Sequence, residues 1–114
     1  MRNKLKLVVN NNFKKKEKFF VKNELRSILN LYAKKVSAGD WKDYGLSINK
    51  REISFDIYQR ASEKPIYRIS KNLSPKRKDE KFYILDRNGS IIRKSEDLET
   101  LIRRVEWTKL KLIK

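Results

Sequence analysis

Residues 46–58, LSINKREISFDIY, contain two stretches in which apolar and polar residues alternate, separated by the polar segment 49–52. A period of two is typical of β-strands that bury one face, and a short polar connection joins antiparallel neighbours. The stretch therefore predicts a hairpin that begins an antiparallel sheet. The alternating apolar positions are Leu46, Ile48, Ile53, Phe55 and Ile57.

Three further strands are predicted downstream, over residues 66–70, 81–85 and 91–94. Residues 71–80 between the first two form a polar loop, and Asn88-Gly89 before the last is a strong hairpin signal. Because all these connections are short, we expect a meander of about five antiparallel strands.

Two amphipathic helices flank this sheet in the sequence. The first begins at Asn23, a favoured helix cap, and ends near Gly39. The second has Ser95 as its predicted cap and carries Glu96, Asp97 and Glu99 in its first turn, where the helix dipole favours acidic residues. Packed on one face of the sheet, the helices give a two-layer α+β domain. Their apolar positions are Leu25, Ile28, Leu29, Tyr32, Ala33 and Val36 in the first, and Leu98, Leu101, Ile102 and Val105 in the second.

The chain of 114 residues has the length of one domain. We place that domain at residues 23–114 and interpret residues 1–22, with eight basic side chains and one acidic, as a basic N-terminal arm. Residues 5–9 are a candidate short strand in the arm, and residues 110–113 are a candidate last strand that would pair with it.

The composition argues against an enzyme. With no cysteine and no histidine, disulfides, thiolate metal sites and the commonest general base are absent. The three glycines form no phosphate-binding array. We therefore expect no catalytic residue, no cofactor and no metal, and a reduced cytoplasmic setting. A magnesium site would have to use four carboxylates that are more simply turn, capping and ion-pair residues, namely Asp40, Asp43, Asp56 and Glu63.

The formal net charge of +16 is the largest departure from an average domain. Such an excess is typical of nucleic-acid-binding proteins, because each lysine or arginine that neutralises a phosphate releases counterions. AT-rich codon usage gives the same excess of lysine, asparagine and isoleucine without any functional cause. An anionic membrane surface is the least favoured partner.

The uncovered face of the predicted sheet is the best candidate for the binding surface. It would interleave Tyr58 and Tyr83 with cations, including Lys81 and one of Arg93 and Lys94. Aromatic rings stack on the bases of single-stranded RNA or DNA while cations follow the backbone, so this chemistry favours a single strand. The same residues are also ordinary for a solvent-facing sheet. The expected nucleic-acid-binding residues are Lys14, Lys15, Lys16, Tyr58, Arg60, Arg68, Lys76, Arg77, Lys78, Tyr83 and Arg93.

A second hypothesis is a protein-interaction or assembly module. An exposed sheet face or a terminal strand can recruit a protein partner, or a second copy in a homodimer, by adding a strand at the edge. Trp41 and Tyr44 beside the first helix fit a hydrophobic plug better than a base-stacking site.

Two segments resemble a small family of alphaproteobacterial proteins known as a domain of unknown function. They are residues 24–44, from ELRSILNLY to VSAGDWKDY, and residues 60–69, RASEKPIYRI. With residues 92–94 and the closing KLKL stretch, the resemblance covers roughly residues 20–113. Ala33 stands where the family pattern has glycine. The resemblance implies a bacterial, intracellular domain that stands alone, and it implies no activity, cofactor or site residue.

Overall fold

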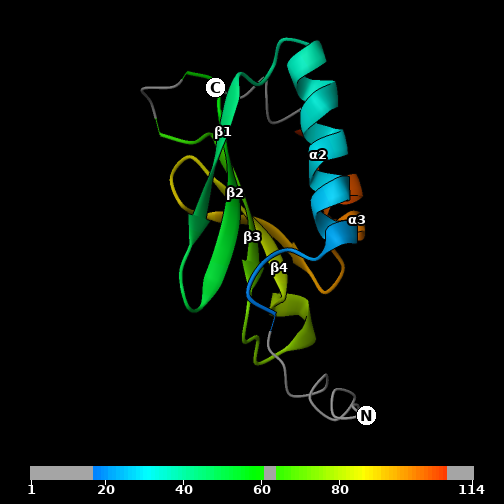
Figure 1. The fold of residues 1–114 in the computed structure, drawn as a ribbon, viewed down its shortest axis with the longest axis vertical. Helices are drawn as coiled ribbons and strands as arrows, with labels where there is room; N and C mark the ends of the chain where they lie inside the picture. The colour runs from blue at the N-terminus through cyan, green and yellow to red at the C-terminus, as the bar shows by residue number, and fades with distance from the viewer. Residues whose placement is uncertain (1–16, 61–63, 108–114) are drawn as a thin grey trace, which may run out of the picture.

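A computed structural model describes residues 17–60 and 64–107. It contains an open sheet of five antiparallel strands in sequence order, with both α-helices on one face (Figure 1). The predicted α+β class and the meander are confirmed, while the candidate strands at residues 5–9 and 110–113 lie outside the described residues. The elements are α2 (Lys22–Ser37), β1 (Asp43–Ile48), β2 (Glu52–Tyr58), β3 (Tyr67–Asn72), the 3₁₀ turn η1 (Lys78–Glu80), β4 (Phe82–Asp86), β5 (Ile91–Ser95) and α3 (Leu98–Arg104).

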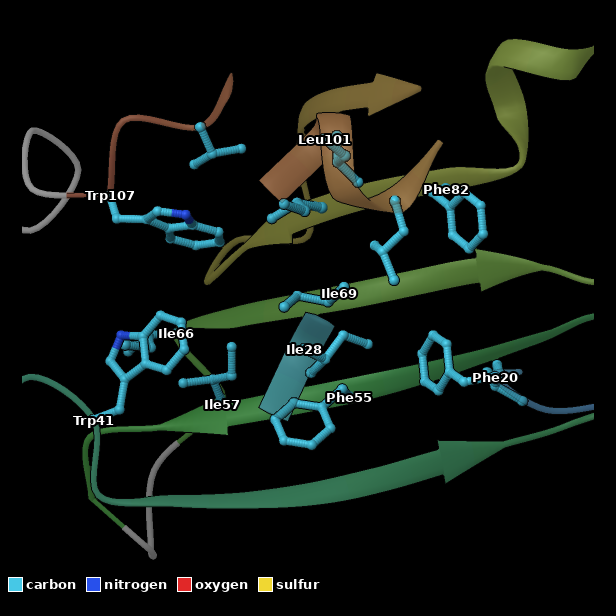
Figure 2. Close-up of a cluster of buried hydrophobic side chains, with 14 residues drawn as sticks. Phe20, Ile28, Trp41, Phe55, Ile57, Ile66, Ile69, Phe82, Leu101 and Trp107 are labelled. Atoms are coloured by element: carbon cyan, nitrogen blue, oxygen red, sulfur yellow. The ribbon is translucent and has the colours of Figure 1, made fainter. Parts of the chain in front are cut away.

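The core lies between the sheet and the helices (Figure 2). Phe55 and Ile57 of β2, in the alternation that predicted the strand, are buried there against Ile28 of α2. Trp41 and Trp107 close one end, with their ring centroids 5.5 Å apart in a T-shaped pair. Trp41 is therefore a hydrophobic plug, as expected.

Both helices begin at a different residue from the predicted cap. The cap of α2 is Val21 rather than Asn23, and the Glu24 carboxylate accepts a hydrogen bond from the Val21 N–H at 2.8 Å. The cap of α3 is Asp97, whose carboxylate accepts from the Thr100 N–H at 2.8 Å. Ser95 cannot be the cap because it is still paired with β4, as the last residue of β5.

The apolar stripe of α2 is wider than the surface that the sheet offers it. Ile28 is fully buried, whereas Leu29 and Val36 are 40% and 41% exposed and Ala33 is exposed as well. The neighbouring edge strand β1 likewise leaves three apolar side chains exposed. We call these exposed positions the β1 flank, and it consists of Leu29, Val36, Tyr44, Leu46 and Ile48.

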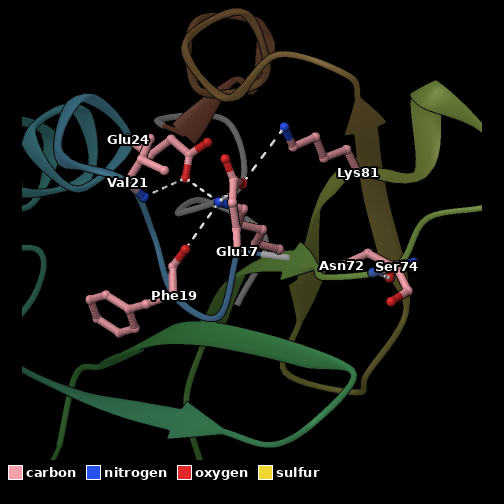
Figure 3. A network of polar contacts seen from close by, with 8 residues as sticks. Glu17, Phe19, Val21, Glu24, Asn72, Ser74 and Lys81 are labelled. Carbon is pink, nitrogen blue, oxygen red and sulfur yellow. Dashed lines mark hydrogen bonds and ion pairs between the residues drawn. The ribbon is translucent and has the colours of Figure 1, made fainter. Parts of the chain in front are cut away.

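Lys71, expected in a polar loop, is a residue of β3 and only 1% exposed. Its ammonium donates to the backbone carbonyl of Phe19 at 3.0 Å and contacts the carboxylates of Glu24 at 2.7 Å and Glu17 at 2.6 Å (Figure 3). The hydrogen bond from Lys71 lowers the pKa of Glu17. These contacts attach residues 17–24 to the sheet, and Phe20, which the sequence placed in the basic arm, is buried in the core.

Candidate nucleic-acid interface

No described helix or strand covers the second face of the sheet (Figure 1). Its side chains alternate with those of the core, because successive residues of a strand point to opposite faces. Tyr58, Arg68 and Tyr83 lie together on this face, as the sequence predicted. We call it the open face, and its residues include Asp43, Ser47, Glu52, Ser54, Asp56, Tyr58, Arg68, Ser70, Tyr83, Leu85, Ile91 and Lys94.

Three long side chains of the open face extend across neighbouring strands. The Tyr83 hydroxyl on β4 donates to the Glu52 carboxylate on β2, so its side chain crosses β3. The Arg68 Nε lies 3.8 Å from an Asp56 oxygen. The ring of Tyr58 reaches β1, where a Cβ built on Gly45 would lie 3.8 Å from Cε1 of the ring. A small side chain at position 45 would therefore touch the Tyr58 ring only at an ordinary van der Waals distance.

Beneath these side chains lies a row of small residues that are buried although no second layer covers them. Ser54, Asp56 and Ser70 are 5%, 3% and 2% exposed. Asp56 accepts hydrogen bonds from the hydroxyls of Ser47 and Ser54, each at 2.6 Å. Buried charges require such partners, so we assign Asp56 a structural role in ordering the face.

The carboxylates considered for magnesium do not assemble. Among residues 17–60 and 64–107, no three acidic side chains come close enough to hold a metal ion. Asp40 lies 3.9 Å from the Lys35 ammonium, and Asp43 accepts from the Tyr44 N–H at 2.8 Å. Glu63 lies outside the described residues.

The Tyr83 hydroxyl is held in its neutral form. Burial raises the pKa of Tyr83 above its ordinary value of 10.0, and the hydrogen bond to Glu52 raises it further. With the hydroxyl bonded to Glu52, the half-buried ring is the part of Tyr83 that remains for a ligand to contact.

Two cations lie elsewhere than expected. The register pairs Lys94 with Tyr83 and Arg93 with the core residue Ile84, so Lys94 shares the open face and Arg93 does not. An irregularity in the pairing after Ile84 makes this phase difficult to read from sequence. Lys81 lies 4.0 Å from Glu17, in the ion-pair network on the helix-covered side (Figure 3).

The remaining predicted residues do not form one cluster. Arg60 is exposed just after β2, at the end of the sheet where Arg68 lies. Lys76, Arg77 and Lys78 lie in the β3–β4 connection at the opposite end, and Nη2 of Arg77 is 3.3 Å from Asp79. Residues 14–16 lie outside the described part of the chain. Of the predicted residues, the structure therefore places Tyr58, Arg68 and Tyr83 on one face of the sheet.

A cleft of about 290 Å³ lies at one end of the open face, between the segment before β3 and the β4–β5 turn. In the sequence, Asn88-Gly89 predicts only a turn and gives no sign of the cations that lie near it in space. We call this the hairpin cleft, and it is lined by Lys64, Pro65, Arg68, Leu85, Asp86, Arg87, Asn88 and Gly89.

Over residues 17–60 and 64–107, the fold and the open face define a small α+β domain of two helices on a five-stranded meander. The chain belongs to the family described as "Protein of unknown function (DUF2794)", whose model matches residues 18–102. This confirms the resemblance to a domain of unknown function. No curated protein and no solved structure matches the chain. Within the described residues, neither helix has the length and apolar character needed to cross a bilayer.

Proposed function

We propose that this protein binds single-stranded nucleic acid, RNA or single-stranded DNA, through the open face, as a non-catalytic cytoplasmic protein. The observation that carries the proposal is that Tyr58, Tyr83, Arg68 and Lys94 share a sheet face that no described element covers. Rings on such a face stack on bases at about 1–3 kcal/mol each, and flanking cations follow the phosphates.

The charge of the whole chain supports the same partner. The described residues alone hold 21 basic and 13 acidic side chains, and the chain as a whole carries +16. Two carboxylates on this side of the sheet accept from hydroxyls, since Asp56 accepts from two serines and Glu52 accepts from Tyr83. The described residues keep a surplus of eight basic side chains, and this surplus attracts phosphate.

A single strand is favoured over a duplex because the tyrosines lie on the broad face of an open sheet. Such a surface cannot enter a groove, and it can stack only on bases that are already unstacked. The sequence of the strand is not expected to matter strongly, because every base offers an aromatic face.

The test is fluorescence anisotropy with labelled oligouridine and oligothymidine of about 12 nucleotides, a length within the usual range for one such domain. A duplex of the same length serves as the comparison, and the protein is treated with nuclease beforehand. We expect tighter binding of the single strands, with log affinity falling by about 0.7 per phosphate contact for each unit of log salt. No binding at about 50 mM salt, or an affinity independent of salt, would contradict the proposal.

The β1 flank favours protein interaction as a second candidate function. Edge strands are usually protected by charged residues, and β5 carries Arg93 and Lys94. β1 has no lysine or arginine and exposes Leu46 at 46% and Ile48 at 62%. An unprotected apolar edge of this kind is suited to pairing with an added strand.

The occupant that we propose for this flank is an extended, acidic segment of a partner protein. Lys42, Lys50 and Arg51 lie just outside the two ends of β1, so acidic residues in the added strand would be attracted and a second copy of this basic chain repelled. A synthetic peptide alternating valine with glutamate should bind the wild type, and the Leu46→Asn variant, which removes apolar surface without adding charge, should bind it at least tenfold more weakly. Equal binding by the two proteins, or a stable dimer by light scattering, would contradict this occupant.

A further inference from the structure

The hairpin cleft combines a concave shape with an excess of positive charge. Three of the residues that line it are cationic: Lys64 before β3, Arg68 within β3 and Arg87 in the β4–β5 turn. Lys64 and Arg87 are exposed, and the Arg68 side chain is 44% exposed. The cleft therefore places the exposed side chains of Lys64 and Arg87 around the guanidinium of Arg68, which belongs to the sheet.

Among the described residues that line the cleft, Asp86 is the one acidic residue, and it is engaged in the turn. Oδ1 of Asp86 accepts hydrogen bonds from the N–H groups of Asn88 at 2.9 Å and Ser90 at 3.0 Å. The register also pairs Asp86 with Tyr67, which contacts Trp41 and Trp107 on the helix-covered side of the sheet. The carboxylate thus orders the turn that carries Arg87, and the cations of the cleft outnumber it by three to one.

The cleft is continuous with the open face through two residues. Arg68 and Leu85 belong to both, and they pair directly across β3 and β4. A strand that lies over Tyr58 and Tyr83 would therefore bring its backbone to the mouth of the cleft. Leu85 and Pro65 add apolar surface, which suits a sugar next to a charged group.

We propose that the hairpin cleft is a phosphate-binding site, which holds a backbone phosphate of the single strand bound on the open face. The proposal rests on the function proposed above. Arg68 and Arg87 supply planar guanidinium groups that can bond two oxygens of one phosphate, and Lys64 adds a mobile point charge. A carboxylate ligand has fewer oxygens than a phosphate with which to bind three cations.

The test removes two of the cations and leaves the open face intact. The variant Lys64→Ala/Arg87→Ala changes two exposed residues, and Lys34→Ala/Arg104→Ala removes the same charge from exposed positions on the helices. For an oligothymidine strand, we expect the cleft variant to lose about tenfold in affinity and about one to two units of salt slope. The helix variant should change the slope by less than half a unit.

A second readout separates the cleft from the proposed function. Inorganic phosphate is titrated into the full-length protein at low salt while the amide resonances of Asn88 and Gly89 are followed. Saturable shifts of these resonances in the wild type that are lost in the cleft variant support the phosphate site. If the shifts occur but no oligonucleotide binds, a free phosphate compound is the ligand and the proposed function is wrong. The phosphate site is overturned if phosphate shifts neither amide resonance, or if oligonucleotides bind the cleft variant and the helix variant with equal affinity. The proposed function is then judged from the oligonucleotide-binding data alone.

Discussion

The hydroxyl of Tyr83 on β4 donates a hydrogen bond to the carboxylate of Glu52 on β2, across the intervening strand β3. The bond fixes an aromatic ring on a face of the sheet that no described helix covers. It also engages one of the few carboxylates near that face. The ring and its anchor therefore have different roles, and substitutions can separate them.

Replacing Tyr83 with phenylalanine removes the anchor and keeps the ring. We expect the Tyr83→Phe variant to lose about 1 kcal/mol of unfolding free energy, the usual net contribution of one hydrogen bond, and to bind oligouridine within twofold of the wild type. Tyr83→Ala removes the ring as well and should weaken binding roughly tenfold. Urea denaturation and anisotropy measure the two effects. If Tyr83→Phe binds as weakly as Tyr83→Ala, the ring is not the contact.

Stability should fall at alkaline pH partly through Tyr83. Burial and the bond to Glu52 raise its pKa in the folded protein above the ordinary value of 10.0, so the folded state retains the proton more strongly than the unfolded state does. The resulting stability is complete below pH 10 and is lost as the pH rises beyond it. The wild type should therefore lose more unfolding free energy than Tyr83→Phe between pH 9 and 11. Parallel pH curves for the two proteins would contradict this assignment.

Lys71 holds the start of α2 on the sheet. The Lys71→Met variant leaves the Glu24 and Glu17 carboxylates and the Phe19 carbonyl without this donor, so we expect a loss of about 3 kcal/mol of unfolding free energy. Lys81→Met is the matched control, because Lys81 is 36% exposed and 4.0 Å from Glu17, and it should cost less than about 1 kcal/mol. Equal losses in urea denaturation would show that the buried network does not carry this stability.

The cap of α3 can be identified by two alanine substitutions. Asp97→Ala removes the acceptor of the Thr100 N–H and should cost about 1 kcal/mol of unfolding free energy. Ser95→Ala removes only an exposed hydrogen bond of 3.1 Å to the Asp97 N–H and should cost about half as much or less. The reverse order in thermal or urea denaturation would support the cap that the sequence suggested.

Much of the fold follows from short-range patterns in the sequence. The alternation of Ile53, Phe55 and Ile57 and the turn at Asn88-Gly89 were sufficient to predict strands and their antiparallel order. The cap of α3 was misplaced because Ser95 and Asp97 are both favourable cap residues, and the pairing of Ser95 with β4 excludes the first. The cap of α2 was misplaced because Glu24 accepts from the Val21 N–H, so the helix begins without a polar cap side chain.

The open face was predictable only in part. Alternation alone placed Tyr58, Arg68 and Tyr83 on it, because each comes directly next in its strand to a residue that points into the core. The face to which each residue of β5 points depends on an irregular pairing with β4, and the burial of Lys71 depends on carboxylates that are distant in the sequence. Neither feature could be predicted from the local sequence. The hairpin cleft brings together residues 64–68 and 85–89, which only the register places side by side.

The most direct test of the central claim compares tyrosines on the two faces of the sheet. Tyr58→Ala/Tyr83→Ala removes both rings of the open face, whereas Tyr44→Ala removes an exposed tyrosine, 45% accessible, from the β1 flank on the other face. Far-UV circular dichroism first establishes that all three proteins are folded, and anisotropy then measures binding to oligouridine at about 100 mM salt. Binding through the open face predicts that the double variant loses at least 30-fold in affinity, roughly 1 kcal/mol or more per ring. The affinity of Tyr44→Ala should differ from that of the wild type by less than twofold. Equal affinities for the double variant and the wild type would contradict it.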